Sequence, residues 1–293
     1  MHISWDDAQI FLAVAEAGSF SEAARLLRQS QPTVSRRIAE LEYRLGLSLF
    51  HRGRRGADLT DDGARLLPSA QQMARWATEF EHAVAAREQQ VRGRVRLAAA
   101  PGVAYDFLVP FSANLRTRHP DLQLEILASV DYVDLTRGDA DLALRSRPPQ
   151  DPALVQLAEL AVPVSVFATP AYAATLPARP TPADVGWICW AHPYRHMTPN
   201  PELEALIPDF APAFASDSYL IQHRACLLGL GAMFLPKITH PLFPDPGLVE
   251  LSLDLPPITG AVYLVCARSA EHIPRIRAVA TALARELGRV QTL

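Results

Sequence analysis

Apolar and polar residues in the first third of the chain follow the period of an α-helix. Between residues 5 and 16 apolar side chains recur every three or four positions, and Gly18 predicts the end of a helix there. A short second helix is expected directly afterwards, with Ser19 or Ser21 as its N-cap. The pattern predicts that the first 92 residues are mainly helical.

The third predicted helix has one apolar face and one polar face. It has Pro32 in its first turn, where proline is tolerated, and it ends at Gly46. Its apolar side chains form one buried stripe: Val34, Ile38, Leu41 and Leu45. Its opposite face carries hydrogen-bonding side chains near the N-terminus: Gln31, Thr33, Ser35, Arg36 and Arg37.

Two short helices joined by a tight turn, the second with Gln, Ser and Arg at its start, are typical of a helix-turn-helix. Gln and Arg form paired hydrogen bonds to adenine and guanine edges, and a helix N-terminus favours phosphate. The alternative is a basic helix face that is merely solvated. Turn spacing, apolar stripe and arginine content together favour contact with double-stranded DNA, and Ser21 and Pro32 belong to the predicted contact set.

A β-hairpin with a basic tip, called the wing, is predicted after the third helix. Its arginines are placed to contact phosphates or to enter a minor groove: Arg52, Arg54 and Arg55. Thr60 then caps a long helix that is expected to reach about Gln89, with a bend near Pro68. One side of this helix is apolar and lacks a partner in the chain, which predicts a homodimer through paired linker helices.

After residue 93 short apolar runs alternate with helical segments. Strands are predicted at residues 95–99, 122–128 and 141–144, with a loop at 100–102 before a helix and another helix at 131–137. This alternation predicts an α/β domain with a parallel sheet. A strand at 214–216, a helix capped by Asp217 or Ser218 and a strand within 227–236 predict a second lobe. Crossing strands near 161–164 and 265–267 join the lobes.

Open α/β sheets bind ligands beyond the carboxyl ends of their strands, so we expect an effector cavity between the lobes. Its predicted residues are Ala100, Pro101, Gly102, Val103, Ser129, Arg145, Ser146, Trp190, His192 and Ser216. Arg145 can hold an anion, and Trp190, His192 and Tyr194 supply an aromatic wall, so the hypothesis is a small anionic or aromatic effector. The alternative is that Arg145 pairs with Glu159 or Asp141.

Composition supports this division of the chain and revises the meaning of its charge. Of the 25 prolines in 293 residues, only Pro32 and Pro68 precede residue 93, as expected for a helical part followed by strands and turns. The net charge of −3 argues against a nucleic-acid partner, yet residues 25–55 alone carry +6.

No apolar run is long enough for a membrane helix and the N-terminus is no signal peptide. Three widely spaced cysteines indicate a reduced, cytoplasmic protein.

The run from Ala15 to Leu67 resembles the LysR-type transcriptional regulators. It reads AEAGSFSEAARLLRQSQPTVSRRIAELEYRLGLSLFHRGRRGADLTDDGARLL, and the later segment LLGLGAMFLP is similar to another family segment. The resemblance implies an α+β multidomain protein: a winged helix-turn-helix at 1–60, a linker helix at 61–90 and a periplasmic-binding-protein-like effector domain at 94–293. That domain comprises two Rossmann-like lobes, lobe I at 94–161 and 268–293 and lobe II at 162–267.

The resemblance also implies residue roles and an assembly. Five residues match the part of the family's recognition helix that contacts bases and backbone, and three match its wing: Gln31, Pro32, Thr33, Ser35, Arg36, Arg52, Arg54 and Arg55. It implies homotetramers that bind near promoters. Many family members have Ser or Thr where this chain has Ala100, Pro101 and Gly102, so the usual hydroxyl donors for a carboxylate are missing.

Other chemistry is poorly supported by the residues. Cys189, His192 and His196 supply only three of the four ligands of a structural zinc site, so no metal is expected. We find no nucleotide-binding glycine motif and no catalytic triad, so neither a cofactor nor an enzyme is expected. The α/β part alone would also suit a solute-binding receptor without a direct role at DNA, which remains the alternative to a DNA-binding regulator.

Overall fold

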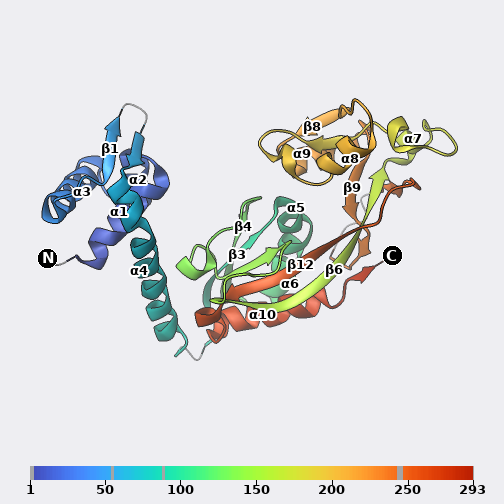
Figure 1. Cartoon of the computed structure of the whole chain (residues 1–293). Helices are drawn as coiled ribbons and strands as arrows, with labels where there is room; N and C mark the ends of the chain where they lie inside the picture. The colour runs from blue at the N-terminus through green and yellow to red at the C-terminus, as the bar shows by residue number, and fades with distance from the viewer. Residues whose placement is uncertain (1–2, 54–55, 88–89, 243–246, 293) are drawn as a thin grey trace. The chain divides into compact units, whose positions relative to one another are not determined.

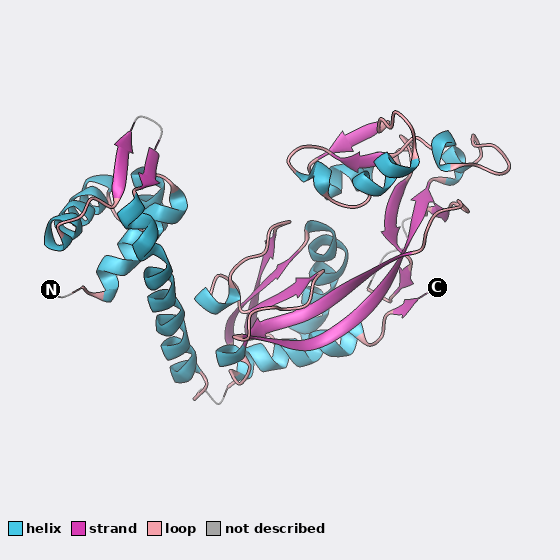
Figure 2. Ribbon diagram, in the orientation of Figure 1, coloured by secondary structure: helices cyan, strands magenta, loops and turns pink. Residues whose placement is uncertain are grey.

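The computed structural model describes residues 3–53, 56–87, 90–242 and 247–292 (Figures 1 and 2). The chain forms two compact units. The first comprises Met1–Ala85 together with the short segment Thr136–Gly138, and the second comprises Ala86–Leu135 and Asp139–Leu293.

The first unit contains a bundle of short helices, a hairpin and a long helix. Its elements are α1 (Trp5–Ala17), α2 (Phe20–Leu26), α3 (Gln31–Leu45), β1 (Phe50–Gly53), β2 (Gly56–Leu59) and α4 (Asp61–Ala85). Strands β1 and β2 pair antiparallel, with Gly53 opposite Gly56. The predicted helix-turn-helix, wing and long helix are therefore confirmed, except that α4 ends at Ala85 and not near Gln89. The bend expected at Pro68 stays a prediction.

Local chemistry explains where these helices begin and end. Gly18 and Gly46 follow α1 and α3 with φ of 59° and 67°, the left-handed region that glycine adopts without a steric penalty. Thr60 caps α4, because its Oγ1 accepts a hydrogen bond from Gly63 N over 3.0 Å. Ser19 occupies the N-cap position of α2, but within the described part of the chain its hydroxyl forms no capping hydrogen bond.

The core of the first unit is built on the predicted stripe of α3. Val34, Ile38 and Leu41 are buried and belong to one cluster with Phe11 of α1 and Phe50 of β1. Each such side chain contributes about 1.5–3 kcal/mol when it leaves water. The stripe thereby leaves the Gln and Arg face of α3 outside the core.

The main sheet of the second unit is mixed. Its strands are β3 (Gly93–Ala99), β4 (Leu122–Ala128), β5 (Leu142–Arg145), β6 (Leu154–Ala168), β9 (Met233–Pro236), β11 (Val249–Glu250) and β12 (Ile258–Ala267). The order is β11-β6-β12-β5-β3-β4, and β9 also pairs with β6. Strand β3 runs parallel to β4 and β5, whereas β12 runs antiparallel to β5 and β6. The parallel pairing predicted for the strands at 95–99, 122–128 and 141–144 is confirmed. Strand β12 joins the same sheet antiparallel, because β6 leaves the first lobe and β12 returns to it in the opposite direction.

The first lobe consists of β3, β4 and β5 with their helices. These are α5 (Pro101–Val103), a π-helical turn (Ala104–Leu108), α6 (Val109–Arg118), a 3-10 turn (Leu135–Arg137) and α10 (Pro274–Leu287). In Figure 1, α10 runs along β6 and β12 and packs on the sheet.

Two elements of the first lobe differ from the predictions. The loop expected at 100–102 already begins a helix at Pro101, because proline has the φ of a first helical residue. The helix expected at 131–137 is reduced to the 3-10 turn. There Ser129 Oγ accepts a hydrogen bond from Asp131 N over 3.1 Å, and Asp139 Oδ2 accepts one from Asp134 N over 3.1 Å. Such local side-chain bonds compete with helical ones.

The second lobe is a smaller layer at the far ends of β6 and β12 (Figure 2). It contains α7 (Pro170–Ala173), a 3-10 turn (Pro182–Asp184), β7 (Ile188–Trp190), a 3-10 turn (Tyr194–His196), α8 (Asn200–Leu206), β8 (Phe214–Ser216) and α9 (Tyr219–Leu227). Strands β7 and β8 pair in parallel, and Trp187 stacks on Phe234 of β9 at 5.3 Å between ring centroids. The remaining elements are β10 (Ile238–Thr239), a 3-10 turn (Arg268–Ala270) and β13 (Gln291–Thr292).

Candidate DNA-binding surface and ligand cavity

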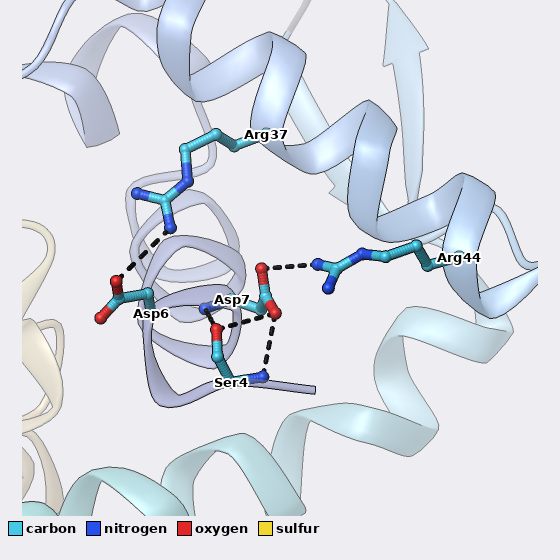
Figure 3. A network of polar contacts seen from close by, with 5 residues as sticks. All are labelled: Ser4, Asp6, Asp7, Arg37 and Arg44. Atoms are coloured by element: carbon cyan, nitrogen blue, oxygen red, sulfur yellow. Dashed lines mark hydrogen bonds and ion pairs between the residues drawn. The ribbon is translucent and has the colours of Figure 1, made fainter. Parts of the chain in front are cut away.

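The C-terminal end of α3 is anchored to the start of α1 (Figure 3). Ser4 N and Ser4 Oγ donate hydrogen bonds to Asp7 Oδ2 over 2.9 and 2.8 Å, and Asp7 N donates to Ser4 Oγ over 3.2 Å. Arg44, in the last turn of α3, places Nη2 2.6 Å from Asp7 Oδ1. One carboxylate therefore caps α1 and orients α3.

The environment of Asp7 shifts its pKa. Burial raises the pKa, but hydrogen bonds from the Ser4 backbone and from Arg44 outweigh burial, and the net result is a pKa below the ordinary value. The carboxylate is therefore ionised at neutral pH and stays paired with Arg44.

Arg37 faces the same junction between α3 and α1. Its Nη2 lies 3.8 Å from Asp6 Oδ2, and its side chain is 30% exposed (Figure 3). The sequence predicted Arg37 to contact DNA, and the structure provides an intramolecular partner for it. The DNA contact of Arg37 stays a prediction.

The N-terminal half of α3 presents the other predicted residues. Gln31 and Pro32 are exposed, Ser35 is half-buried, and the Arg36 side chain is 73% exposed. Arg36 Nε lies 3.7 Å from Glu40 Oε1, one turn further along the helix. An exposed ion pair of this kind contributes at most about 1 kcal/mol, so Arg36 is available to a phosphate or a base.

Two further predicted residues differ in their surroundings. Ser21 is exposed on α2. Thr33 takes part in the cap of α3, because Ser30 Oγ accepts a hydrogen bond from Thr33 N over 3.3 Å and lies 2.7 Å from Thr33 Oγ1. The hydroxyl of Thr33 thus helps to hold the N-terminal turn of α3.

Glu42 links α3 to the wing, a role that the sequence analysis missed. Its Oε1 accepts hydrogen bonds from Leu49 N over 2.7 Å and from Phe50 N over 3.3 Å. In the wing, Arg52 pairs across the hairpin with Ala57. The predicted contacts of Arg54 and Arg55 lie outside the described residues.

A cavity of about 820 Å³ lies beyond the carboxyl ends of β3, β4 and β5 and extends to the second lobe. Eight of the ten predicted residues line it: Ala100, Pro101, Gly102, Val103, Ser129, Arg145, Ser146 and Trp190. His192 and Ser216 are outside its lining. His192 is exposed, and Ser216 Oγ accepts a hydrogen bond from Ser218 N over 3.1 Å.

Arg145 is held by groups of the first lobe. Its Nη2 donates to the Val133 carbonyl over 2.6 Å, and its guanidinium carbon lies 5.0 Å from the centroid of the Tyr132 ring. Burial lowers the pKa of Arg145. Among the described residues Arg145 forms an ion pair with neither Glu159 nor Asp141, the two carboxylates named as alternative partners. Asp141 Oδ2 instead accepts a hydrogen bond from Arg96 N over 2.6 Å, and Glu159 one from Gln156.

Three cavity residues were missed by the sequence analysis: Asp106, Tyr219 and His223. Asp106 lies on the π-helical turn of the first lobe, and the other two lie one turn apart on α9 of the second. The Tyr219 and His223 rings stack at 5.9 Å between centroids with an interplanar angle of 12°. Burial raises the pKa of Asp106, and the charge of His223 offsets part of this rise. Their spacing along α9 was visible in the sequence, but their approach to Asp106 was not.

The three cysteines show the features of core residues. Cys189, Cys226 and Cys266 are free thiols with no exposed surface, and burial raises their pKa values to about 12, 11 and 12. Among residues 3–53, 56–87, 90–242 and 247–292 no three metal-ligating side chains gather at one point. Within the same ranges no helix is long and apolar enough to cross a membrane.

Together these features define a class of protein, a winged helix-turn-helix unit followed in the chain by a two-lobed α/β unit with a ligand cavity. Residues 5–64 match the family model for the bacterial regulatory helix-turn-helix protein, lysR family, and residues 88–288 match that for the LysR substrate binding domain. The chain belongs to the LysR family.

Curated relatives bear regulator names. An HTH-type transcriptional regulator of Xanthomonas campestris pv. campestris is 36% identical over 167 residues, 57% of this chain and 48% of that protein. CrgA of Neisseria meningitidis serogroup C is 30% identical over 50% of this chain and 49% of its own length. The chain thus spans about half the length of these relatives. PtxR of Pseudomonas aeruginosa is 29% identical over 98% of this chain and 94% of that protein.

Solved structures share the fold along the whole chain. A full-length OxyR variant from Pseudomonas aeruginosa has a TM-score of 0.64 at 20% identity and covers 98% of this chain and 95% of that chain. CbnR complexed with its target DNA has a TM-score of 0.56 at 18% identity, and the match covers 97% of this chain and 100% of that chain.

Proposed function

We propose that this protein is a DNA-binding transcriptional regulator whose action at promoters depends on a small molecule in the cavity of the second unit. The observation that carries the proposal is the exposed N-terminal half of α3, with Gln31 and Arg36 facing solvent while Asp7 and Arg44 hold the helix on α1. The match to the bacterial regulatory helix-turn-helix model supports it. So does the likeness in fold to CbnR, a protein whose structure was solved with its target DNA.

In this function the residues of the first unit have separate tasks. Gln31, Ser35 and Arg36 enter the major groove and read base edges, and Pro32 and Thr33 shape the first turn that approaches a phosphate. Ser21 and the wing arginines contact the backbone, which sets the register on the duplex. Arg37 has a double task, since Asp6 orients it beside the same helix.

Assembly follows from the apolar surface of α4. Trp76, Phe80 and Val84 recur every four residues and are exposed, at 61%, 73% and 59%. We infer that two α4 helices pair along this stripe into a homodimer, and that dimers associate into a homotetramer. The resulting pair of α3 helices suits two half-sites one DNA turn apart.

The second unit supplies the response to a ligand. A small molecule that binds both lobes differently in two arrangements shifts the population between them, which alters the spacing or bend imposed on DNA. The proposal also includes the domain division at 1–60, 61–90 and 94–293, with two lobes in the last domain. It further includes a cytoplasmic location and no catalytic role. No step of it requires a cofactor.

A gel shift with the DNA upstream of the protein's own gene tests the proposal. We expect Ser35→Ala and Arg36→Ala each to weaken specific binding by about tenfold or more, because a paired contact to a base is worth about 1–3 kcal/mol. Arg65→Ala is the matched control, since this exposed arginine is paired with Asp62 on α4 and not on α3. Unchanged specific binding by both α3 variants would refute the assignment of α3 as the recognition helix.

Salt dependence separates a regulator from a solute-binding receptor. The logarithm of the binding constant should fall against the logarithm of salt concentration with a slope of about −0.9 per phosphate contacted. A receptor without a role at DNA would bind its ligand normally and show no affinity for the upstream DNA at any salt concentration.

A further inference from the structure

The cavity of the second unit has a polarity that limits what it can bind. Its walls are mainly apolar, and its charged side chains differ in exposure. Asp131 and Arg224 are exposed, whereas Asp106 and Arg145 are half-buried. A ligand that leaves water therefore meets chiefly the charges of Asp106 and Arg145.

Arg145 is already engaged by the protein. It donates to the Val133 carbonyl over 2.6 Å and lies over the Tyr132 ring. These contacts engage Nη2 and one face of the guanidinium, whereas among the described residues its buried Nε has no hydrogen-bond partner, so a hydrogen-bond acceptor on the ligand suits this end of the cavity.

Asp106 has no such support. Among the described residues its carboxylate forms no hydrogen bond and no ion pair, and the charged group closest in effect is His223 across the cavity. A partly buried carboxylate without a partner is unfavourable, and a cationic hydrogen-bond donor is the group that relieves it. The half-buried carboxylate of Asp106 thus lines the cavity as an acceptor open to a ligand.

The usual alternative, an anion at the N-terminus of the first helix, is hindered here. A Cβ at Gly102 would lie 2.7 Å from Tyr219 Cε1, which shows how closely that ring covers the first turn of α5. Ala100 contributes no hydroxyl, and Asp106 repels a carboxylate placed beside it. Helix start and cavity charge together disfavour an anion at this end.

We propose that the cavity binds an organic amine whose ammonium group is held by Asp106 and whose apolar body lies along the lining that includes Trp190 and Met197. This inference rests on the proposed function of the cavity and names its ligand class. The amine joins Asp106 of the first lobe to Tyr219 and His223 of the second, so binding favours the arrangement in which α9 lies against the first lobe.

Matched probe pairs test the sign of the ligand's charge. Phenethylamine with 3-phenylpropionate, tryptamine with indole-3-propionate, and hexylamine with heptanoate share a body and differ only in the charged group. Each probe is titrated calorimetrically into the full-length protein and its Asp106→Asn variant. Asp131→Asn is the matched control, because Asp131 also lines the cavity but is exposed. Thermal unfolding checks that both variants are folded. If Asp106→Asn does not fold, Asp106→Glu, which retains the charge, is titrated in its place.

We expect at least one amine to bind more tightly than its carboxylate partner, and Asp106→Asn to weaken it by about tenfold or more, as for loss of a charge-assisted hydrogen bond. Asp131→Asn should change the affinity by less than about threefold. Tighter binding of the carboxylates, equal loss in both variants or no binding by any amine would overturn the inference. A gel shift with the same protein decides the proposed DNA-binding function separately, since a regulator with another ligand would still bind its DNA.

Discussion

Asp7 performs two tasks with one carboxylate, closing the first turn of α1 and receiving Arg44 from α3. Both contacts stabilise its ionised form, which is why its pKa is depressed although the side chain is buried. At the residue scale, the orientation of α3, the proposed recognition helix, therefore depends on a carboxylate of α1.

Asp7→Asn should destabilise the protein at neutral pH by about 1–3 kcal/mol, the usual cost of losing a buried hydrogen bond to a charged group. Because the folded-state pKa is lowered, the contribution of Asp7 is complete above the unfolded value of about 3.9 and disappears as pH falls through the folded value. Urea unfolding at neutral pH and below pH 4 measures this.

Asp6→Asn provides the control for the Asp7 experiment. Asp6 is 71% exposed and lies 3.8 Å from Arg37, so its loss should cost less than about 0.5 kcal/mol. An Asp7→Asn effect that is the same at neutral and acidic pH would contradict the ionic role assigned to Asp7.

At the element scale, Glu42 connects α3 to the wing. Glu42 accepts hydrogen bonds from the backbone amides of Leu49 and Phe50, where a side chain is needed to satisfy the amides that lead into β1. Helix and hairpin are therefore oriented as one surface, although they form by different local rules.

Glu42→Ala should loosen the start of the wing, because it leaves these two amides without their acceptor at a cost of about 1–3 kcal/mol. Hydrogen exchange of the Leu49 and Phe50 amides is expected to accelerate, and affinity for DNA to fall. Glu42→Gln keeps a carbonyl acceptor and should show a smaller change. Equal exchange rates in Glu42→Ala and the wild type would argue against the link.

At the scale of the whole molecule, the proposed assembly depends on the exposed stripe of α4. A double Trp76→Glu and Phe80→Glu variant should be monomeric, because each aromatic side chain buries about 150–250 Å² in an interface. At about 25 cal/mol per Å² this corresponds to ~4–6 kcal/mol for each ring. Loss of both rings should therefore lower dimer affinity by more than a thousandfold.

Sedimentation of the variant against Glu79→Ala, an exposed change on the same helix, measures the effect. DNA affinity should fall with dimerisation, whereas ligand binding by the second unit should persist. A variant that sediments like the wild type would exclude α4 as the dimer contact.

The sequence by itself determined the elements of the first unit. The stripe of Val34, Ile38 and Leu41, and the glycines at 18 and 46, act within a few residues of one another, so their period and conformational preferences were sufficient. The sheet strands at 122–128 and 214–216 were likewise visible as apolar runs. The helix predicted at 131–137 was wrong, because hydrogen bonds from the backbone to the side chains of Ser129 and Asp139 replace the helical ones.

Only the tertiary structure decided how distant groups meet. Arg37 faces Asp6 because α3 crosses the start of α1, and β12 runs antiparallel because the chain returns from the second lobe. Asp106 and α9 line the same cavity because β6 leads from the first lobe to the second and β12 returns. Side-chain direction and encounters between remote segments depend on packing across the whole unit, and no pattern within a short window encodes them.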